Sequence, residues 1–164
     1  MAIIFFGLVS CDSSKKYSTE PDQEPSKLKG CEGRIDVQVS GDTIYSVRSL
    51  GYYYLAFTTA LKSLNDDLKI VDYGCYYAED GGWVDQTEEG RKFGSVKDFE
   101  ESYNCPNGLL KKNISYYNDF NWVIRTKELD GSARHVLLYF LAEDGEGNLF
   151  KGTKTFVGIL EEKK

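Results

Sequence analysis

The sequence predicts an α+β domain in which one long helix packs on an antiparallel β-sheet meander. Three observations lead to this expectation: one long stretch with helical spacing, several stretches with strand-like alternation, and two short loops between the last strands. The predicted order is strand, helix, strand, irregular insertion and three more strands. A single helix laid across the sheet would cover the apolar face of each element.

The long helix is expected over residues 43–64. Apolar side chains recur there at intervals of three and four residues: Val47, Leu50, Tyr54, Phe57, Leu61 and Leu64. This spacing places them on one stripe of an α-helix. No other stretch of the chain has a long helical pattern, so we expect this stripe to face the sheet.

Shorter patterns fill the first two thirds of the chain. Alternation over residues 34–40 and a β-rich run over residues 68–78 each predict a strand. Residues 79–112 are irregular and form the predicted insertion. Within it Ser95 and Asp98 resemble a capping box, which predicts a short helix over residues 96–103.

The last fifty residues predict three strands, over residues 120–125, 135–142 and 149–160. Asp130–Gly131 and the loop 144–148 provide the turns between them. The middle strand is apolar on both faces, so we expect it to be central in the sheet. The complete order resembles cystatin-like and NTF2-like α+β folds in architecture, although no cystatin inhibitory motif is present.

The N-terminal residues predict the cellular location of the protein. Residues 2–9 are apolar and have the length of a signal-peptide core. They run into Leu8-Val9-Ser10-Cys11, which resembles the lipobox of bacterial lipoproteins. The resemblance implies a signal peptide over residues 1–10, an acylated Cys11, and a mature chain anchored in the bacterial cell envelope that faces the periplasm. Asp12 resembles the signal for retention in the inner membrane and favours that location.

The domain organisation follows from the same segment. Residues 11–30 are predicted to be the lipidated cysteine and a flexible polar tether, and residues 31–164 a single domain. Three cysteines then remain for an oxidising compartment and allow three single bridges. We expect a Cys75–Cys105 disulfide, because these two residues bracket the insertion.

The composition of the chain limits the classes of function that the protein can have. A net charge of −6 argues against a nucleic-acid partner. The single histidine, His135, and the absence of a CxxC pair give no basis for a metal site, and we expect no cofactor. Carboxylates in the insertion are compatible with glycosidase chemistry, but acidic residues in a solvated loop are the commoner case. The aromatic residues there are the candidate binding residues: Trp83, Phe93 and Tyr103.

We therefore predict a non-enzymatic, membrane-anchored envelope lipoprotein that binds a protein partner, with enzyme inhibitors and toxin-immunity proteins as candidate types. The alternative is a structural or assembly lipoprotein of a larger envelope complex. A carboxylate-based hydrolase is the third hypothesis.

Overall fold

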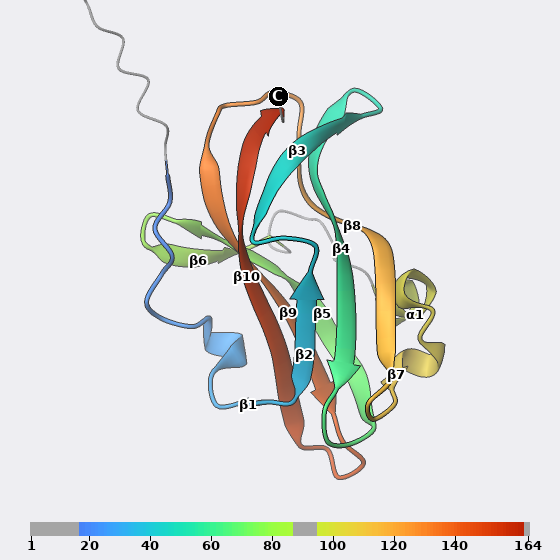
Figure 1. Cartoon of the computed structure of the whole chain (residues 1–164). Coiled ribbons are helices and arrows are strands. Elements are labelled where there is room, and N and C mark those ends of the chain that lie inside the picture. The colour runs from blue at the N-terminus through green and yellow to red at the C-terminus, as the bar shows by residue number, and fades with distance from the viewer. Residues whose placement is uncertain (1–16, 87–94, 163–164) are drawn as a thin grey trace, which may run out of the picture.

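The computed structural model describes residues 17–86 and 95–162. Over these residues the chain forms one curled sheet of ten strands and one α-helix (Figure 1). The elements are η1 (Ser26–Leu28), β1 (Glu32–Gly33), β2 (Ile35–Val39), β3 (Thr43–Ser49), β4 (Tyr52–Ser63), β5 (Leu68–Glu79), β6 (Gly82–Asp85), α1 (Val96–Tyr103), η2 (Pro106–Gly108), β7 (Leu109–Leu110), β8 (Ser115–Thr126), β9 (Ala133–Glu143) and β10 (Leu149–Glu162).

The sheet is organised around two long strands, β4 and β10. One edge of β4 pairs with β3 along its first half and with β2 along its second half, and the other edge pairs with β8. Strand β10 pairs antiparallel with β9 on one edge and parallel with β1 and β3 on the other. Strand β9 continues to β5, which carries β6 and β7. The sheet curls over so that residues of β4 and β8 share one core with residues of β5, β9 and β10.

The predicted long helix over residues 43–64 is wrong. The segment is a β-hairpin, β3 and β4, joined by the two residues Leu50 and Gly51. The buried residues of β4 alternate with period two: Leu55, Phe57, Thr59, Leu61 and Ser63. By contrast, Val47 and Leu64 from the predicted helical stripe are exposed. The segment is rich in aromatic and β-branched residues that favour strands, and pairing with three neighbouring strands overrides its helical spacing.

The predicted meander is also wrong, and with it the α+β class and the likeness to cystatin-like and NTF2-like folds. Strands β8 and β9 follow each other in the chain but do not pair. Strand β8 pairs with β4, whereas β9 lies between β10 and β5. Asp130–Gly131 therefore lies in a loop between separate parts of the curled sheet, and the protein is mostly β.

Shorter predictions are confirmed. Residues 35–39 form β2, and residues 68–79 form β5. Helix α1 covers Val96–Tyr103 and has the predicted capping box: the Ser95 N–H donates to Asp98 Oδ2 at 2.6 Å, and the Asp98 N–H donates to Ser95 Oγ at 3.3 Å. Strand β9 is buried on both faces and is central, as its sequence predicts.

Two glycines of β10 allow the sheet to close tightly. A Cβ atom on Gly152 would lie 2.6 Å from Ile35 Cβ and 2.7 Å from the Ile35 carbonyl oxygen. A Cβ atom on Gly158 would overlap the Leu55 side chain. These contacts show that β2 and β4 lie directly against the backbone of β10, and a larger residue would push them apart.

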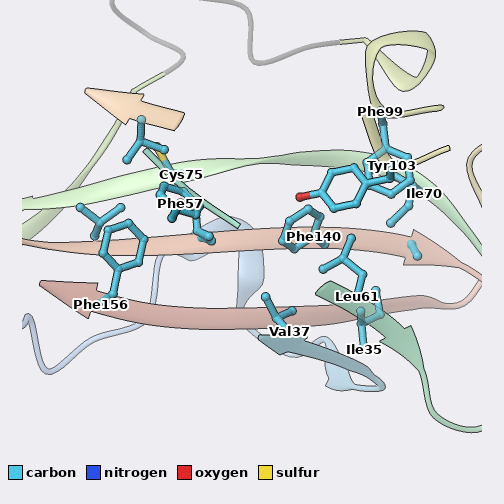
Figure 2. Close-up of a cluster of buried hydrophobic side chains, with 14 of the residues drawn as sticks. Ile35, Val37, Phe57, Leu61, Ile70, Cys75, Phe99, Tyr103, Phe140 and Phe156 are labelled. Atoms are coloured by element: carbon cyan, nitrogen blue, oxygen red, sulfur yellow. The ribbon is translucent and has the colours of Figure 1, made fainter. Parts of the chain in front are cut away.

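Aromatic rings pack together within a mostly aliphatic core (Figure 2). Phe57 and Phe156 pack at a centroid distance of 5.0 Å. Helix α1 contributes Phe99 and Tyr103, which are buried and reach Phe140. Because α1 contacts both β8 and β5, it fills the side of the curled sheet between these two strands.

The described part of the predicted tether, residues 17–30, lies on the domain. Tyr17 forms a parallel bridge with Ala133, and Lys27 forms an ion pair with Asp72. Leu28 is fully buried in a second, smaller cluster that covers the outer face of β9. The predicted signal peptide, Cys11 and the tether before Tyr17 lie outside the described residues.

The predicted Cys75–Cys105 disulfide is not formed: within the described ranges Cys31, Cys75 and Cys105 are free. Cys105 precedes the η2 turn, whose Gly108 lies against Ile70 on β5. Cys75 is five residues further along β5, about 17 Å at the rise of a strand. A disulfide needs the two Cα atoms within about 7 Å, so the bridge does not fit this fold.

Candidate binding face

The structure separates the residues that the sequence suggested for binding. Trp83 lies on β6 and is half-buried against the cluster that contains Leu28 and Tyr139. Tyr103 is 2% exposed and belongs to the main core. Phe93 lies outside the described residues. Trp83 and Tyr103 therefore do not form one surface.

Exposed aromatic side chains gather instead on the outer face of β4 and β8. We call this surface the aromatic band and define it by four residues: Tyr54, Tyr117, Phe120 and Trp122. Tyr117 and Phe120 are 62% and 66% exposed, and Trp122 is 39% exposed. Such rings on a monomer surface mark sites of interaction, because Tyr and Trp are the usual anchors of protein interfaces.

The strand pairing explains why these rings stand clear of the sheet. Trp122 is paired with Ala56 and Tyr117 with Ala60, so small residues occupy the neighbouring positions of β4. Trp122 also packs edge-to-face against Tyr54, with ring centroids 5.3 Å apart. Rings held on two paired strands lose little conformational freedom on binding.

A polar network beneath the aromatic band joins β8 to α1. The hydroxyl oxygens of Tyr103 and Thr59 are 2.7 Å apart, and Asn121 Nδ2 donates to both, at 3.1 Å and 3.3 Å. Burial raises the pKa of Tyr103, so its hydroxyl stays neutral and hydrogen-bonded. Asn121 faces this network, whereas its neighbours Phe120 and Trp122 belong to the band.

A bulge in β8 ends the aromatic band. Ile124 has a φ of 51°, which is rare for a β-branched residue, and the register with β4 shifts between Val123 and Arg125. Val123 and Ile124 are both buried as a result. Arg125 then returns to the outer face, with its guanidinium carbon 3.6 Å from the centroid of the Tyr52 ring.

Phe120, Trp122 and Ile124 occupy alternate positions in the sequence, which would place all three on one face of a regular strand. The bulge is the reason that only the first two share the outer face. A run of two apolar residues, Val123-Ile124, inside an alternating stretch is the one signal that points to such a bulge.

His135, the single histidine of the chain, has structural contacts. The His135 N–H donates to Ser18 Oγ at 2.9 Å, and His135 Nδ1 lies 3.0 Å from the Ser18 carbonyl oxygen, so this histidine holds the N-terminal segment. Across residues 17–86 and 95–162, no group of three or more His, Cys, Asp or Glu side chains is placed to hold a metal ion. The helix found in those ranges is too short and too polar to span a membrane.

Comparisons with protein-family models, curated proteins and solved structures found no match for this chain.

Proposed function

We propose that this protein is a lipid-anchored envelope protein that holds a protein partner on its aromatic band. The observation that carries the proposal is the grouping of exposed Tyr117, Phe120 and Trp122 with half-buried Tyr54 on the paired strands β4 and β8. Large rings in this arrangement bury much apolar area at low entropic cost, which is how interface anchors supply most of the binding energy. The lipobox-like residues ending at Cys11 support the anchored location.

The aromatic band suits a partner surface with an exposed apolar patch. The four side chains present apolar rings, and the Tyr and Trp rings also carry a polar group that tolerates water at the rim. The partner is expected to be a folded protein of the same compartment, which agrees with an inhibitor, a toxin-immunity protein or an assembly factor.

Site-specific photo-crosslinking tests this proposal in cells that produce the protein naturally. A benzophenone amino acid replaces Phe120 in one variant and Val71, which is 37% exposed on β5, in a matched control. We expect a covalent adduct with one protein from position 120 and none from position 71. Adding Trp122→Ala should reduce the adduct by about tenfold or more, because an interface anchor typically costs at least 2 kcal/mol to remove.

The same experiment tests whether Cys11 anchors the protein to the membrane. The adduct should fractionate with membranes, and Cys11→Ser should release it to the soluble fraction. Equal crosslinking from positions 71 and 120, or an adduct that is insensitive to Trp122→Ala, would show that the aromatic band does not bind the partner.

A further inference from the structure

The turn of the β3–β4 hairpin exposes an apolar side chain in an unfavourable backbone conformation. Leu50 and Gly51 both have positive φ, 48° and 77°, as in the type I′ turns that favour Asn-Gly. A leucine fits this conformation less well than asparagine or glycine. Leu50 is nevertheless 92% exposed, so it gains little from packing within the domain. A strained, exposed apolar residue indicates an interaction outside the domain.

Aromatic and cationic side chains surround this leucine. We call the group the hairpin tip and define it by six residues: Arg48, Leu50, Tyr52, Tyr53, Arg125 and Lys127. The Arg48 guanidinium carbon lies 5.7 Å from the centroid of the Tyr53 ring. The Arg125 guanidinium carbon lies 3.6 Å from the centroid of the Tyr52 ring, and Lys127 Nζ lies 5.8 Å from the same centroid. Three exposed cations are thus held around two tyrosines, although the whole chain carries a net charge of −6.

Several carboxylates lie at the same end of the molecule as the hairpin tip but are not part of it. Asp130 forms an ion pair with Arg134 at 3.7 Å. The Glu161 carboxylate lies next to Gly131 in the loop between β8 and β9. Glu128 follows Lys127 in the chain and is the acidic residue nearest to the tip in sequence.

The loop between β9 and β10 carries Asp144 and Glu146, and Figure 1 shows this loop at the end away from the β3–β4 hairpin. Asp144 accepts hydrogen bonds from the amides of Glu146 and Asn148 within its own loop. Arg48, Leu50 and Lys127 therefore lie at the other end of the molecule, where a negatively charged surface would attract the two cations.

Tyr17, where the described chain begins, lies in line with Tyr45 of the hairpin across the neighbouring strands. Tyr17 is paired with Ala133, Ala133 with Ile159, and Ile159 with Tyr45 across neighbouring strands. Along β3, Leu50 lies five residues beyond Tyr45, which is about 17 Å. In the other direction along β10, ten residues separate Ile159 from Leu149, which is about 33 Å.

The length of chain before Tyr17 then selects the end that faces the membrane. This step rests on the proposed anchoring at Cys11, which is six residues before Tyr17. Six residues span at most about 22 Å. That length reaches a bilayer touched by Leu50, but it does not reach one touched by Leu149.

We propose that the hairpin tip binds the anionic headgroup surface of the bilayer that carries the lipid anchor. Leu50 enters the interfacial region, Tyr52 and Tyr53 lie at the headgroup level, and Arg48 and Lys127 pair with lipid phosphates. Apolar insertion combined with attraction to anionic lipids is the general basis of such interfacial binding. The aromatic band on β4 and β8 then remains free for the protein partner.

Vesicle sedimentation of the full chain carrying Cys11→Ser tests the hairpin tip without the contribution of the acyl chains. The probes are vesicles of phosphatidylcholine alone and of phosphatidylcholine mixed with phosphatidylglycerol. The N-terminal residues are common to all variants, so the measured quantity is the gain in binding on adding the anionic lipid. We expect a clear gain at low salt that decreases as salt screens the charges.

Three variants locate the interaction. Leu50→Asn should weaken binding to the mixed vesicles about tenfold, since one apolar side chain is lost from the interface. Its melting temperature should stay level or rise, because asparagine suits the type I′ turn. Arg48→Ser combined with Lys127→Ser should weaken binding roughly 25-fold, at about fivefold for each cation. Leu149→Asn, at the far end, is the control and should bind as the parent does.

The proposal is overturned if the parent shows no preference for anionic vesicles, or if Leu50→Asn and Leu149→Asn bind them equally. Loss of the protein adduct at position 120 in Leu50→Asn, with vesicle binding unchanged, would assign the hairpin tip to the protein partner instead. Failure of the photo-crosslink alone removes the partner assignment of the aromatic band and leaves the vesicle result standing. Absence of acylation at Cys11 removes the chain-length step and is measured separately by acyl labelling.

Discussion

Tyr103 and Tyr117 show how one residue type has two uses in this protein. Tyr103 is 2% exposed, and its hydroxyl lies in a network with Thr59 and Asn121. Tyr117 is 62% exposed on the aromatic band, opposite Ala60. Both are tyrosines in a chain with 12 of them, and the side of the sheet that each one faces determines its role.

Removing the Tyr103 hydroxyl should therefore destabilise the domain. In Tyr103→Phe, Thr59 Oγ1 and Asn121 Nδ2 lose a buried partner, and we expect the free energy of unfolding to fall by about 1–3 kcal/mol. The urea midpoint measures this change. Tyr117→Phe is the matched control, and its midpoint should equal that of the parent. Equal midpoints for the two variants would mean that the buried network contributes no stability.

Among the elements, those with a clear local signal were predictable from the sequence, and those without one were not. The capping box of Ser95 and Asp98 is contained in four residues, and α1 begins where it predicts. The β3–β4 hairpin was missed because its turn is Leu50-Gly51 and not Asn-Gly, and because its apolar residues happen to match a helical spacing. The aromatic band was missed because its outer face depends on the Ile124 bulge and on pairing with β4.

The cap of α1 can be tested directly. Ser95→Ala removes the acceptor for the Asp98 N–H, and we expect a loss of about 1 kcal/mol in unfolding free energy. Lys97→Ala, an exposed substitution in the same turn, should be neutral. The comparison uses urea unfolding followed by far-UV circular dichroism. A Ser95→Ala protein as stable as Lys97→Ala would exclude a stabilising role for the capping box.

In the whole molecule, the curled sheet fixes the positions of the N-terminal segment, the hairpin tip and the aromatic band relative to one another. The N-terminal segment is held at the start of β9, the hairpin tip lies beyond the end of β3, and the aromatic band follows β4 and β8. Local sequence cannot show this arrangement, because it depends on the close contact of Gly152 with Ile35 and on strand pairings across the sheet. The apolar character of both faces of β9 did reveal in advance that this strand is central.

The buried ionisable groups predict how the stability of the whole domain responds to alkaline pH. Burial raises the pKa of Tyr73 and Tyr76 to about 12, with contributions from Asp98 and Asp85 respectively. Burial, with a contribution from Glu100, raises the pKa of Cys105 to about 11. The unfolded chain releases these protons at lower pH than the folded protein, so it binds fewer protons above about pH 9.

Stability should therefore be full below about pH 9 and fall steadily as pH rises to about 12. The urea midpoint as a function of pH measures this dependence. Cys105→Ala removes one of the three groups and should make the decline shallower between about pH 9 and 11. A midpoint that stays constant up to about pH 11 would contradict the prediction.

The parallel pairing of β10 with the N-terminal strands has a consequence for how the chain folds. Glu32 pairs with Phe150, and Thr43 pairs with Val157. Strands near the start of the chain therefore cannot complete their pairing until strands near its end are available. Contacts so distant in sequence make folding slow, because a long loop must close before they contribute stability. During synthesis the sheet cannot close until β10, the last fourteen residues of the described chain, has emerged. For the envelope location proposed above, this delay would keep the unfinished chain open for export, because the sheet closes only after the end of the chain has emerged.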